Sequence, residues 1–484
     1  MKTPTPLVLD LIDAIGEEAV VWHDEDLLVY EYDGTIDRGN PDVIALPANT
    51  DDVVSLIKIA NKYEAPVTPR GAGTGLSGGA LAAKGGVIIG MNRMRRILDV
   101  DPENKTALVQ PGVVNLDLGS EAERYGLAYA PDPSSQRACT IGGNIAENAG
   151  GPHTLAWGTT TNHVLALELV TADGEVQWIG HDTRDEPGYD LVGCVVGSEG
   201  TVGIVTQALV RLVPRPTAVR TMLAIYDSVR QASNAVSAVV ASGIVPAALE
   251  MIDKMTIAAV EPVLNTGFPL DAEAVLLVEV DGPESQVEAE GARVEGILNR
   301  FEPREVRSAT DPEEREHLWA GRKGAIGALG QIMPNYYLLD GVVPRTQLPD
   351  VLDGVYEIAE RYRLPVANMF HAGDGNLHPC LLFDEREPGA TERVLDAGGE
   401  IMRLCVDAGG AITGEHGVGL EKRDYLPWIF TEADMDTMKS LRAAFGPTEN
   451  FNPCKIFPKG HGCGEAGHQH AQHQIAKFGP KAFV

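Results

Sequence analysis

The sequence predicts an α+β protein of two domains, and three observations lead to this prediction. The chain has 484 residues, more than the roughly 250–300 at which one hydrophobic core stops growing. A glycine-rich loop at 70–80 lies between two short apolar segments. From residue 221 onward, strand and helix patterns alternate at longer spacing, as in an α+β sandwich. Pro214 and Pro216 separate the two regions, and we place the main domain boundary there.

The first domain is expected to begin with a short strand at 43–47. Thr50 suits the N-cap of the next helix, because its hydroxyl can accept a backbone hydrogen bond. Strands are expected at 66–69 and 86–91, on either side of the glycine-rich loop.

A hairpin is expected later in this domain. The pair Asp173-Gly174 favours a two-residue turn between strands at 164–171 and 175–179. A further strand is expected at 204–213.

The second domain is expected to contain several longer elements, and one more helix is expected near the end of the chain. The predicted strands cover 222–226, 247–251, 274–280, 336–343, 366–371 and 378–383. The predicted helices cover 229–241, 283–298, a segment from 311, 348–361 and 434–445.

The loop at 70–80 has five glycines among eleven residues, so it presents backbone N–H groups with few side chains. Such a loop suits a pyrophosphate, and Arg70 supplies a positive charge. Gly71-Ala72-Gly73 followed by Gly75 loosely matches the GxGxxG dinucleotide motif. That motif requires a helix directly after the loop, whereas a strand is expected here, so we reject it. A flexible linker is the other alternative, and it is disfavoured because the loop joins two strands.

Metal-binding residue types gather in two glycine-framed segments, 370–378 and 414–417. His371 and His378 offer imidazole nitrogens and Glu415 a carboxylate, a set that suits a divalent transition metal such as Zn, Mn or Fe. His416 has the right chemistry for a general base. The alternative is that these are hydrogen-bonded histidines in turns. Four such residues in two segments favour a catalytic site.

Bulk properties exclude some classes of function. The formal net charge of −30 disfavours binding to nucleic acid or to anionic lipid surfaces. No apolar stretch approaches the roughly 20 residues of a membrane-spanning helix, and the N-terminus lacks the pattern of a secretory signal. The six cysteines are scattered, as in reduced proteins. We therefore expect a cytoplasmic protein without direct membrane insertion, membrane-associated only through partner subunits.

These motifs together resemble the FAD-linked oxidase family, which has the vanillyl-alcohol-oxidase type of flavin fold. The resemblance is strongest to its glycolate oxidase and D-lactate dehydrogenase branch, and it extends over about residues 20 to 458. The segments that carry it are 69–80, 129–151, 197–203, 319–323, 335–337, 340–341, 371–379, 414–419 and 452–453.

The resemblance implies an arrangement of domains. It places an FAD-binding domain at 1–215 and an α+β substrate (cap) domain with the metal site at 216–425. A C-terminal segment at 426–460 would return to the FAD-binding domain, and 461–484 would form a flexible His-rich tail.

It also implies the residues that bind FAD. The pyrophosphate loop would comprise Arg70, Gly71, Ala72, Gly73, Thr74, Gly75, Leu76 and Ser77. The flavin and ribityl chain would contact Pro131, Ser134, Gly142, Gly143, Asn144, Asn148 and Gly151. The pocket would be completed by Glu199, Gly200, Ile204 and Asn452. Relatives with covalent flavin often have a histidine where this chain has Thr74, so we expect non-covalent FAD.

For catalysis, the resemblance implies oxidation of a 2-hydroxy acid to a 2-oxo acid. The metal would be held by the three ligands named above, and His416 would deprotonate the α-hydroxyl while a hydride passes to flavin N5. Arg322 would bind the substrate carboxylate, and Tyr337 would also contact the substrate.

The substrate is expected to be a small monocarboxylate, glycolate or D-lactate. Related dehydrogenases for dicarboxylates use a lysine shortly before Pro344, and this chain has no lysine in the stretch 336–338. Two alternatives stay open: a D-lactate or D-2-hydroxyglutarate dehydrogenase that works alone, and a non-catalytic flavin-fold subunit. A glycolate oxidase would include a second flavin-type subunit and an iron–sulfur subunit.

Overall fold

The computed structural model describes residues 3–183 and 188–458, and it divides into two compact units. Unit 1 consists of Met1–Ala149, Thr159–Val213 and Glu415–Val484, and unit 2 of Gly150–Gly158 and Pro214–Gly414. The FAD-binding domain was expected to end at 215, and the corresponding part of unit 1 ends at Val213. The substrate domain was expected to end at 425, whereas unit 2 ends at Gly414. The tail expected at 461–484 lies outside the described residues.

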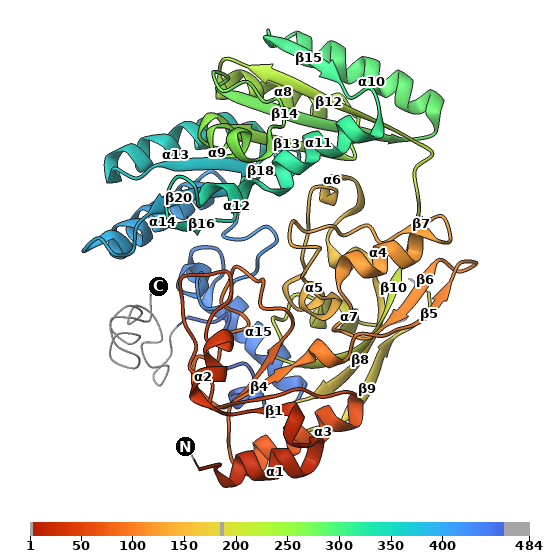
Figure 1. The fold of residues 1–484 in the computed structure, drawn as a ribbon, viewed down its shortest axis with the longest axis vertical. Helices are drawn as coiled ribbons and strands as arrows, with labels where there is room; N and C mark the ends of the chain where they lie inside the picture. The colour runs from red at the N-terminus through yellow and green to blue at the C-terminus, as the bar shows by residue number, and fades with distance from the viewer. Residues whose placement is uncertain (1–2, 184–187, 459–484) are drawn as a thin grey trace. The chain divides into compact units, whose positions relative to one another are not determined.

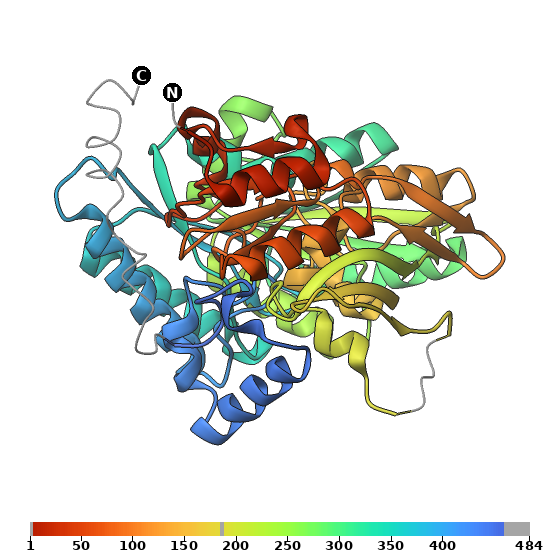
Figure 2. The same ribbon diagram turned by 90° about the horizontal axis from the view of Figure 1, so that it is seen from below.

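The first sheet of unit 1 contains three parallel strands and one antiparallel strand, in the order β1-β2-β4-β3. They are β1 (Val20–Val21), β2 (Val43–Ala45), β3 (Val67–Arg70) and β4 (Val87–Gly90). Helices α1 (Pro6–Ile15) and α3 (Thr50–Lys62) lie side by side and pack their apolar faces against this sheet (Figure 2). A strand does follow the glycine-rich loop, as predicted.

The N-cap prediction for α3 was wrong by one residue. Asn49 is the N-cap, and its side chain accepts from the backbone N–H of Asp52. The hydroxyl of Thr50 instead donates to Glu168 Oε1 at 2.7 Å. Asn and Thr both favour this position, so tertiary contacts decided between the two.

The second sheet of unit 1 is antiparallel, in the order β5-β6-β10-β8-β9. Its strands are β5 (Ile97–Asp101), β6 (Thr106–Val109), β8 (Val164–Thr171), β9 (Val176–Gly180) and β10 (Gly203–Arg211). The predicted hairpin is confirmed, but the two-residue turn at Asp173-Gly174 is not: the N–H of Gly174 donates to the carbonyl of Thr171 at 2.9 Å, so the turn is centred on Ala172 and Asp173. Gly174 has φ of 81°, which suits glycine in such a turn.

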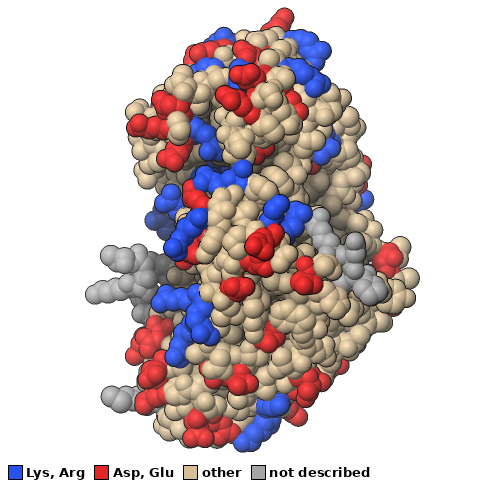
Figure 3. Space-filling model, turned by 90° about the vertical axis from the view of Figure 1, so that its right-hand side faces the viewer, with Lys and Arg blue, Asp and Glu red and all other residues tan. Residues whose placement is uncertain are grey.

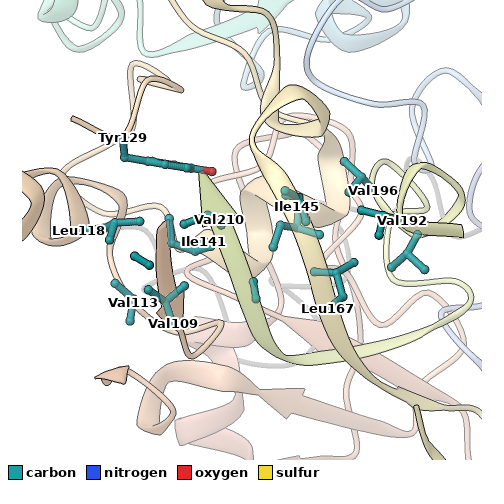
Figure 4. Packing of buried hydrophobic residues seen from close by; sticks show 14 of the residues in the cluster. Val109, Val113, Leu118, Tyr129, Ile141, Ile145, Leu167, Val192, Val196 and Val210 are labelled. Atoms are coloured by element: carbon teal, nitrogen blue, oxygen red, sulfur yellow. The ribbon is translucent and has the colours of Figure 1, made fainter. Parts of the chain in front are cut away.

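Three helices bury apolar side chains against this second sheet. They are α4 (Asn115–Glu123), α5 (Ile141–Glu147) and α7 (Leu191–Val195). Figure 4 shows side chains of this core, with Ile141 of α5 beside Val210 of β10 and Ile145 of α5 near Leu167 of β8. The sequence did not predict α5, because its two glycines disfavour a helix.

Unit 2 is built on an antiparallel seven-stranded sheet in the order β15-β12-β14-β13-β18-β20-β16 (Figure 1). Its strands are β12 (Ala218–Tyr226), β13 (Ala248–Asp253), β14 (Ala274–Gly282), β15 (Glu305–Ser308), β16 (Asn335–Leu338), β18 (Val366–Phe370) and β20 (Pro379–Phe383). The strand expected at 336–343 is interrupted after β16, and β17 (Gly341–Val342) pairs instead with β19 (Asn376–Leu377).

Apart from the short helix α6 (Thr154–Trp157), which contacts β13, the helices of unit 2 fall into two groups by their contacts. One group packs in the sequence α10, α8, α13, α14: α8 (Val229–Ala241), α10 (Glu284–Asn299), α13 (Leu348–Tyr362) and α14 (Ala390–Asp407). The other group consists of α9 (Lys254–Leu264), α11 (Pro312–Lys323) and α12 (Ala325–Leu329). Helices α9 and α14 were not predicted. Pro262 in α9 and the Gly398-Gly399 pair in α14 both disfavour helix in sequence.

The surface carries many charges, as the composition requires. Figure 3 shows acidic and basic side chains interspersed over one face of the protein. Among the described residues, no helix combines the length and apolar character needed to cross a membrane.

We predict that Leu167→Ala lowers the free energy of unfolding by about 2–5 kcal/mol, because the removed side chain leaves a cavity in a packed core. Leu167 in β8 is fully buried, whereas Val176 in the neighbouring strand β9 is 47% exposed. Thermal unfolding should therefore show a large decrease in Tm for Leu167→Ala and almost none for the control Val176→Ala. Equal decreases would contradict this description of the core.

Candidate functional site

The side chain of Arg70 makes hydrogen bonds that hold the glycine-rich loop of unit 1 in place. Its buried guanidinium donates to the carbonyl oxygens of Tyr32 at 2.8 Å and Ala80 at 3.4 Å. Gly73 has φ of 72°, and a Cβ at that position would come within 2.1 Å of Arg70 Nη2. Only glycine fits here, so the loop keeps a bare backbone. The contact of Arg70 with a pyrophosphate stays a prediction.

Asn452 joins two of the predicted cofactor segments. Its Nδ2 donates to the carbonyl oxygens of Gly79 at 3.0 Å and Glu199 at 2.6 Å. The carboxylate of Glu199 accepts from the backbone N–H groups of Val418 at 2.7 Å and Gly419 at 2.6 Å. Asn452 and Glu199 both have positive φ, a strained conformation that persists only where the surroundings require it. Segments far apart in sequence are thus fixed together.

Glu147, at the end of α5, was missed by the sequence analysis. It accepts a hydrogen bond from Ser77 Oγ at 3.3 Å. Cβ atoms at Gly79 and Gly417 would lie 2.4 and 2.3 Å from its carboxylate oxygens, so both backbones pass very close to it. Burial raises the pKa of Glu147, and the nearby Glu199 carboxylate raises it further. The available signal was a single carboxylate in a run of glycine and apolar residues.

The segment predicted to contact flavin contains a buried side chain that needs a partner. Asn144 is 2% exposed, and both polar atoms of its amide have no hydrogen-bond partner among the described residues. Buried amides are normally satisfied, so this position fits a bound group with donors and acceptors. Nearby, Asn148 is left-handed and its Oδ1 accepts from the N–H of Thr161 at 2.9 Å.

The other predicted cofactor residues have varied surroundings. The carbonyl of Pro131 accepts from Asn115 Nδ2 at 2.9 Å. Gly200 has φ of 64°, and a Cβ there would lie 2.6 Å from the ring of Pro69. Gly151 belongs to unit 2, so the structure does not place it with the others.

His371 and His378 come together in unit 2, as the motif suggested. His371 follows β18 directly and His378 lies between β19 and β20. Their ring centroids are 5.1 Å apart at 83°, and a nitrogen of each ring lies within 4.8 Å of the other. Two nitrogens bound to one Zn²⁺ ion at about 2.0–2.1 Å each lie closer together than this limit. Both rings are buried, and the pair fits two ligands of one metal ion.

Glu250 was also missed, although it contacts two of the predicted residues. It lies in β13 with no exposed surface, and its Oε1 is 2.8 Å from His371 Nδ1. Its Oε2 accepts from Arg322 Nε at 2.6 Å. Burial would raise the pKa of Glu250, but His371 and Arg322 outweigh it and lower the pKa. A lone carboxylate inside an apolar strand was the signal in sequence.

Arg322 keeps part of its guanidinium available. The side chain lies near the end of α11 and is 3% exposed, and its Nη2 has no hydrogen-bond partner among the described residues. A buried guanidinium nitrogen in this state suits an anionic ligand such as a carboxylate.

Asp340 anchors the end of unit 2. Its Oδ2 accepts from Thr413 Oγ1 at 2.5 Å and from the N–H of Gly414 at 3.0 Å. Its Oδ1 lies 3.5 Å from His378 Nε2. Glu415 follows Gly414 by one peptide bond, so its Cα must be about 3.8 Å from that of Gly414.

The remaining two predicted residues of the catalytic site, His416 and Tyr337, lie in different surroundings. Within unit 1, His416 Nε2 lies 3.7 Å from Glu415 Oε1. Tyr337 is buried in β16, and its ring meets Gly398 of α14, where a Cβ would come within 2.5 Å. The predicted substrate contact of Tyr337 gains no support from this position.

Two family models match the chain. The FAD binding domain matches residues 41–180, and the C-terminal domain of FAD linked oxidases matches residues 215–456. Together they cover both units.

Curated relatives align over nearly the whole chain. The glycolate oxidase subunit GlcD of Escherichia coli strain K12 is 44% identical over 98% of this chain and 95% of its own length. GlcD of Bacillus subtilis strain 168 is 41% identical over 93% and 96%, respectively. A D-lactate dehydrogenase of Anaerostipes hadrus is 31% identical over 93% of this chain and 97% of its own.

Among solved structures, p-cresol methylhydroxylase with bound substrate has a TM-score of 0.79 at 16% identity, covering 93% of this chain and 96% of that one. This similarity confirms the α+β fold with a vanillyl-alcohol-oxidase type FAD-binding domain. The chain belongs to the FAD-linked oxidase family and is an FAD-dependent oxidoreductase.

Proposed function

We propose that this enzyme oxidises a small 2-hydroxy monocarboxylate, with glycolate as the first candidate and D-lactate as the second, to the 2-oxo acid. The observation that carries the proposal is the buried Arg322, whose Nη2 has no partner among the described residues, linked through Glu250 to His371. This arrangement offers an anion site beside metal-type ligands. The relatives that are glycolate oxidase subunits support glycolate.

FAD fits the residues of unit 1. The bare loop from Gly71 to Ser77 suits the pyrophosphate, and the amide of Asn144 suits the flavin or ribityl chain. When bound, FAD supplies the acceptor for the hydrogen and two electrons that leave the substrate Cα. Thr74 stands where relatives with covalent flavin often have a histidine, so we propose that the cofactor is bound non-covalently.

A divalent metal fits the donors of unit 2. We propose that it is held by His371, His378 and Glu415, since Asp340 fixes the chain up to Gly414, the residue before Glu415. Zn, Mn and Fe all accept such ligands. The bound ion would supply a Lewis acid that increases the acidity of the α-hydroxyl.

Two side chains of the protein bind the substrate and accept its proton. Arg322 binds the substrate carboxylate through Nη2, which orients the Cα–H bond. His416 accepts the α-hydroxyl proton on a ring nitrogen as general base. The substrate thereby loses one proton to the base and one hydrogen with two electrons to the cofactor, which gives the 2-oxo acid.

The partners and location follow from the glycolate assignment. We propose that the chain works with a second flavin-type subunit and an iron–sulfur subunit, in the cytoplasm or at a membrane through those partners. A D-lactate dehydrogenase that works alone is the second candidate, favoured by the Anaerostipes hadrus relative. A non-catalytic subunit is disfavoured, because it would have no use for the buried Arg322–Glu250–His371 connection.

We predict that glycolate or D-lactate reduces the bound flavin under anaerobic conditions, seen as bleaching near 450 nm. A chelator should slow the reaction, because it would remove the proposed ion that would make the α-hydroxyl more acidic. L-lactate and D-2-hydroxyglutarate serve as comparison substrates. Fastest bleaching by D-2-hydroxyglutarate would contradict the monocarboxylate assignment, and no bleaching by any acid would favour the non-catalytic alternative.

We predict that Arg322→Lys raises the KM for glycolate by about 10- to 100-fold, because a charge-assisted hydrogen bond to the carboxylate contributes about 1.5–3 kcal/mol. Lysine retains the charge next to Glu250 but lacks the planar fork. The matched control is Arg315→Lys, seven residues earlier in α11, where Arg315 pairs with Glu279. Steady-state kinetics with similar KM changes in both variants would contradict a specific role for Arg322.

We predict that FAD dissociates on denaturation. After precipitation with acid, the supernatant should be yellow and the protein pellet colourless. A yellow pellet would show a covalent bond and would refute the role assigned to Thr74.

A further inference from the structure

We propose that Glu250 is a positioning residue that sets one metal ligand and the substrate-binding arginine at the same time. This inference rests on the proposed function, because it assigns His371 to the metal and Arg322 to the substrate. It goes further because it assigns a role to a third residue. Glu250 would touch neither the metal ion nor the substrate, and it would couple the binding of the one to the binding of the other.

The strand register places Glu250 for this role. In the antiparallel pair of β13 and β18, Met251 lies opposite Phe370 and Ile252 opposite Met369, so the next pair along is Glu250 and His371. The N–H of Gly373 donates to the carbonyl of Leu249 at 3.0 Å, which extends the connection beyond β18. The carboxylate and the imidazole are therefore held by backbone pairing rather than by flexible loops.

The carboxylate selects the tautomer of His371. An ionised carboxylate only accepts hydrogen bonds, so Nδ1, at 2.8 Å from Oε1, must carry the hydrogen. The lone pair is then on Nε2, the nitrogen through which His371 would bind the metal. Carboxylate–histidine–metal connections of this kind orient the ligand and increase its basicity.

The second oxygen determines how Arg322 is presented. Glu250 Oε2 accepts a hydrogen bond from Arg322 Nε at 2.6 Å, so this nitrogen is occupied. Arg322 Nη2 has no hydrogen-bond partner among the described residues. One carboxylate thus directs an imidazole and a guanidinium. A change in the position of either group alters the hydrogen bond that holds the other.

Glutamine at this position cannot satisfy both groups. The glutamine side chain has nearly the same shape as glutamate, but an NH2 group, which is a donor, replaces one of the two acceptor oxygens. If that group faces His371, the ring must present a lone pair at Nδ1, and its Nε2 carries the hydrogen. If it faces Arg322, two donors meet. Either orientation disturbs one member of the pair.

The sheet contains a matched control. Glu279 in the adjacent strand β14 is equally buried, and it binds Arg315 of the same helix through two hydrogen bonds, at 2.7 and 2.8 Å. It also accepts from Trp319 Nε1 at 2.9 Å. Glu279→Gln therefore removes a comparable buried charge without touching His371 or Arg322.

The test measures Zn²⁺ affinity by competition with a chromophoric chelator on the full-length flavoprotein, together with kcat and KM for glycolate. For Glu250→Gln we expect metal affinity to fall by about 10- to 100-fold, with a rise in KM for glycolate. Glu279→Gln should leave metal affinity within twofold of wild type. Glu250→Asp, which retains two acceptor oxygens, should recover part of the loss, and it replaces Glu250→Gln if that variant does not fold.

Two outcomes would overturn the inference: unchanged metal affinity in both Glu250 variants, or an equal loss in Glu279→Gln, which would indicate general loosening of the sheet. Failure of the proposed function has a different signature. If wild-type protein binds no divalent ion, or if it binds the ion but oxidises no 2-hydroxy acid, the functional assignment fails. In the second case the metal-affinity comparison still decides whether Glu250 positions His371.

Discussion

The structure depends on hydrogen bonds and ion pairs that compensate the buried carboxylates for the loss of water. A carboxylate removed from water is costly unless it is paired or hydrogen-bonded, and removing one partner of a buried ion pair costs roughly 3–5 kcal/mol. Glu199 meets this requirement with two backbone N–H groups, and Glu250 with an imidazole and a guanidinium. In each case the donors come from segments far away in sequence, so the carboxylate determines where those segments lie.

In unit 1 this constraint acts together with close backbone packing. Asn452 donates to two carbonyl oxygens at once, and the glycine at 417 passes next to Glu147 and Glu199. The C-terminal segment is thereby attached to the glycine-rich loop. These hydrogen bonds account for the C-terminal segment belonging to the same unit as the loop.

In unit 2 the same constraint acts on the residues of the proposed substrate and metal site. Two diagonal positions on neighbouring strands carry Glu250 and Glu279, and each binds an arginine from one face of α11. Glu279 has its oxygens fully used, by Arg315, Trp319 and Thr221. Glu250 instead leaves part of Arg322 without a protein partner. This difference between the two pairs is what supports the proposal that Arg322, and not Arg315, binds an anion.

The sequence by itself determined the family, most of the strands and the longer amphipathic helices, and it supplied the residue types of the proposed site: a glycine-rich loop, two histidines and an arginine. These features are local, because hydrophobic period, turn residues and side-chain type can be read over a few positions. Tertiary structure alone decided which carboxylates orient those groups. Glu147 and Glu250 are each a single carboxylate in an apolar run, a signal that does not name the partner, and helices such as α5 and α9 contain residues that disfavour them. Their roles arise from burial and from partners more than 60 residues away, as for Ser77 with Glu147 and Arg322 with Glu250. Such contacts exist only once the chain has folded.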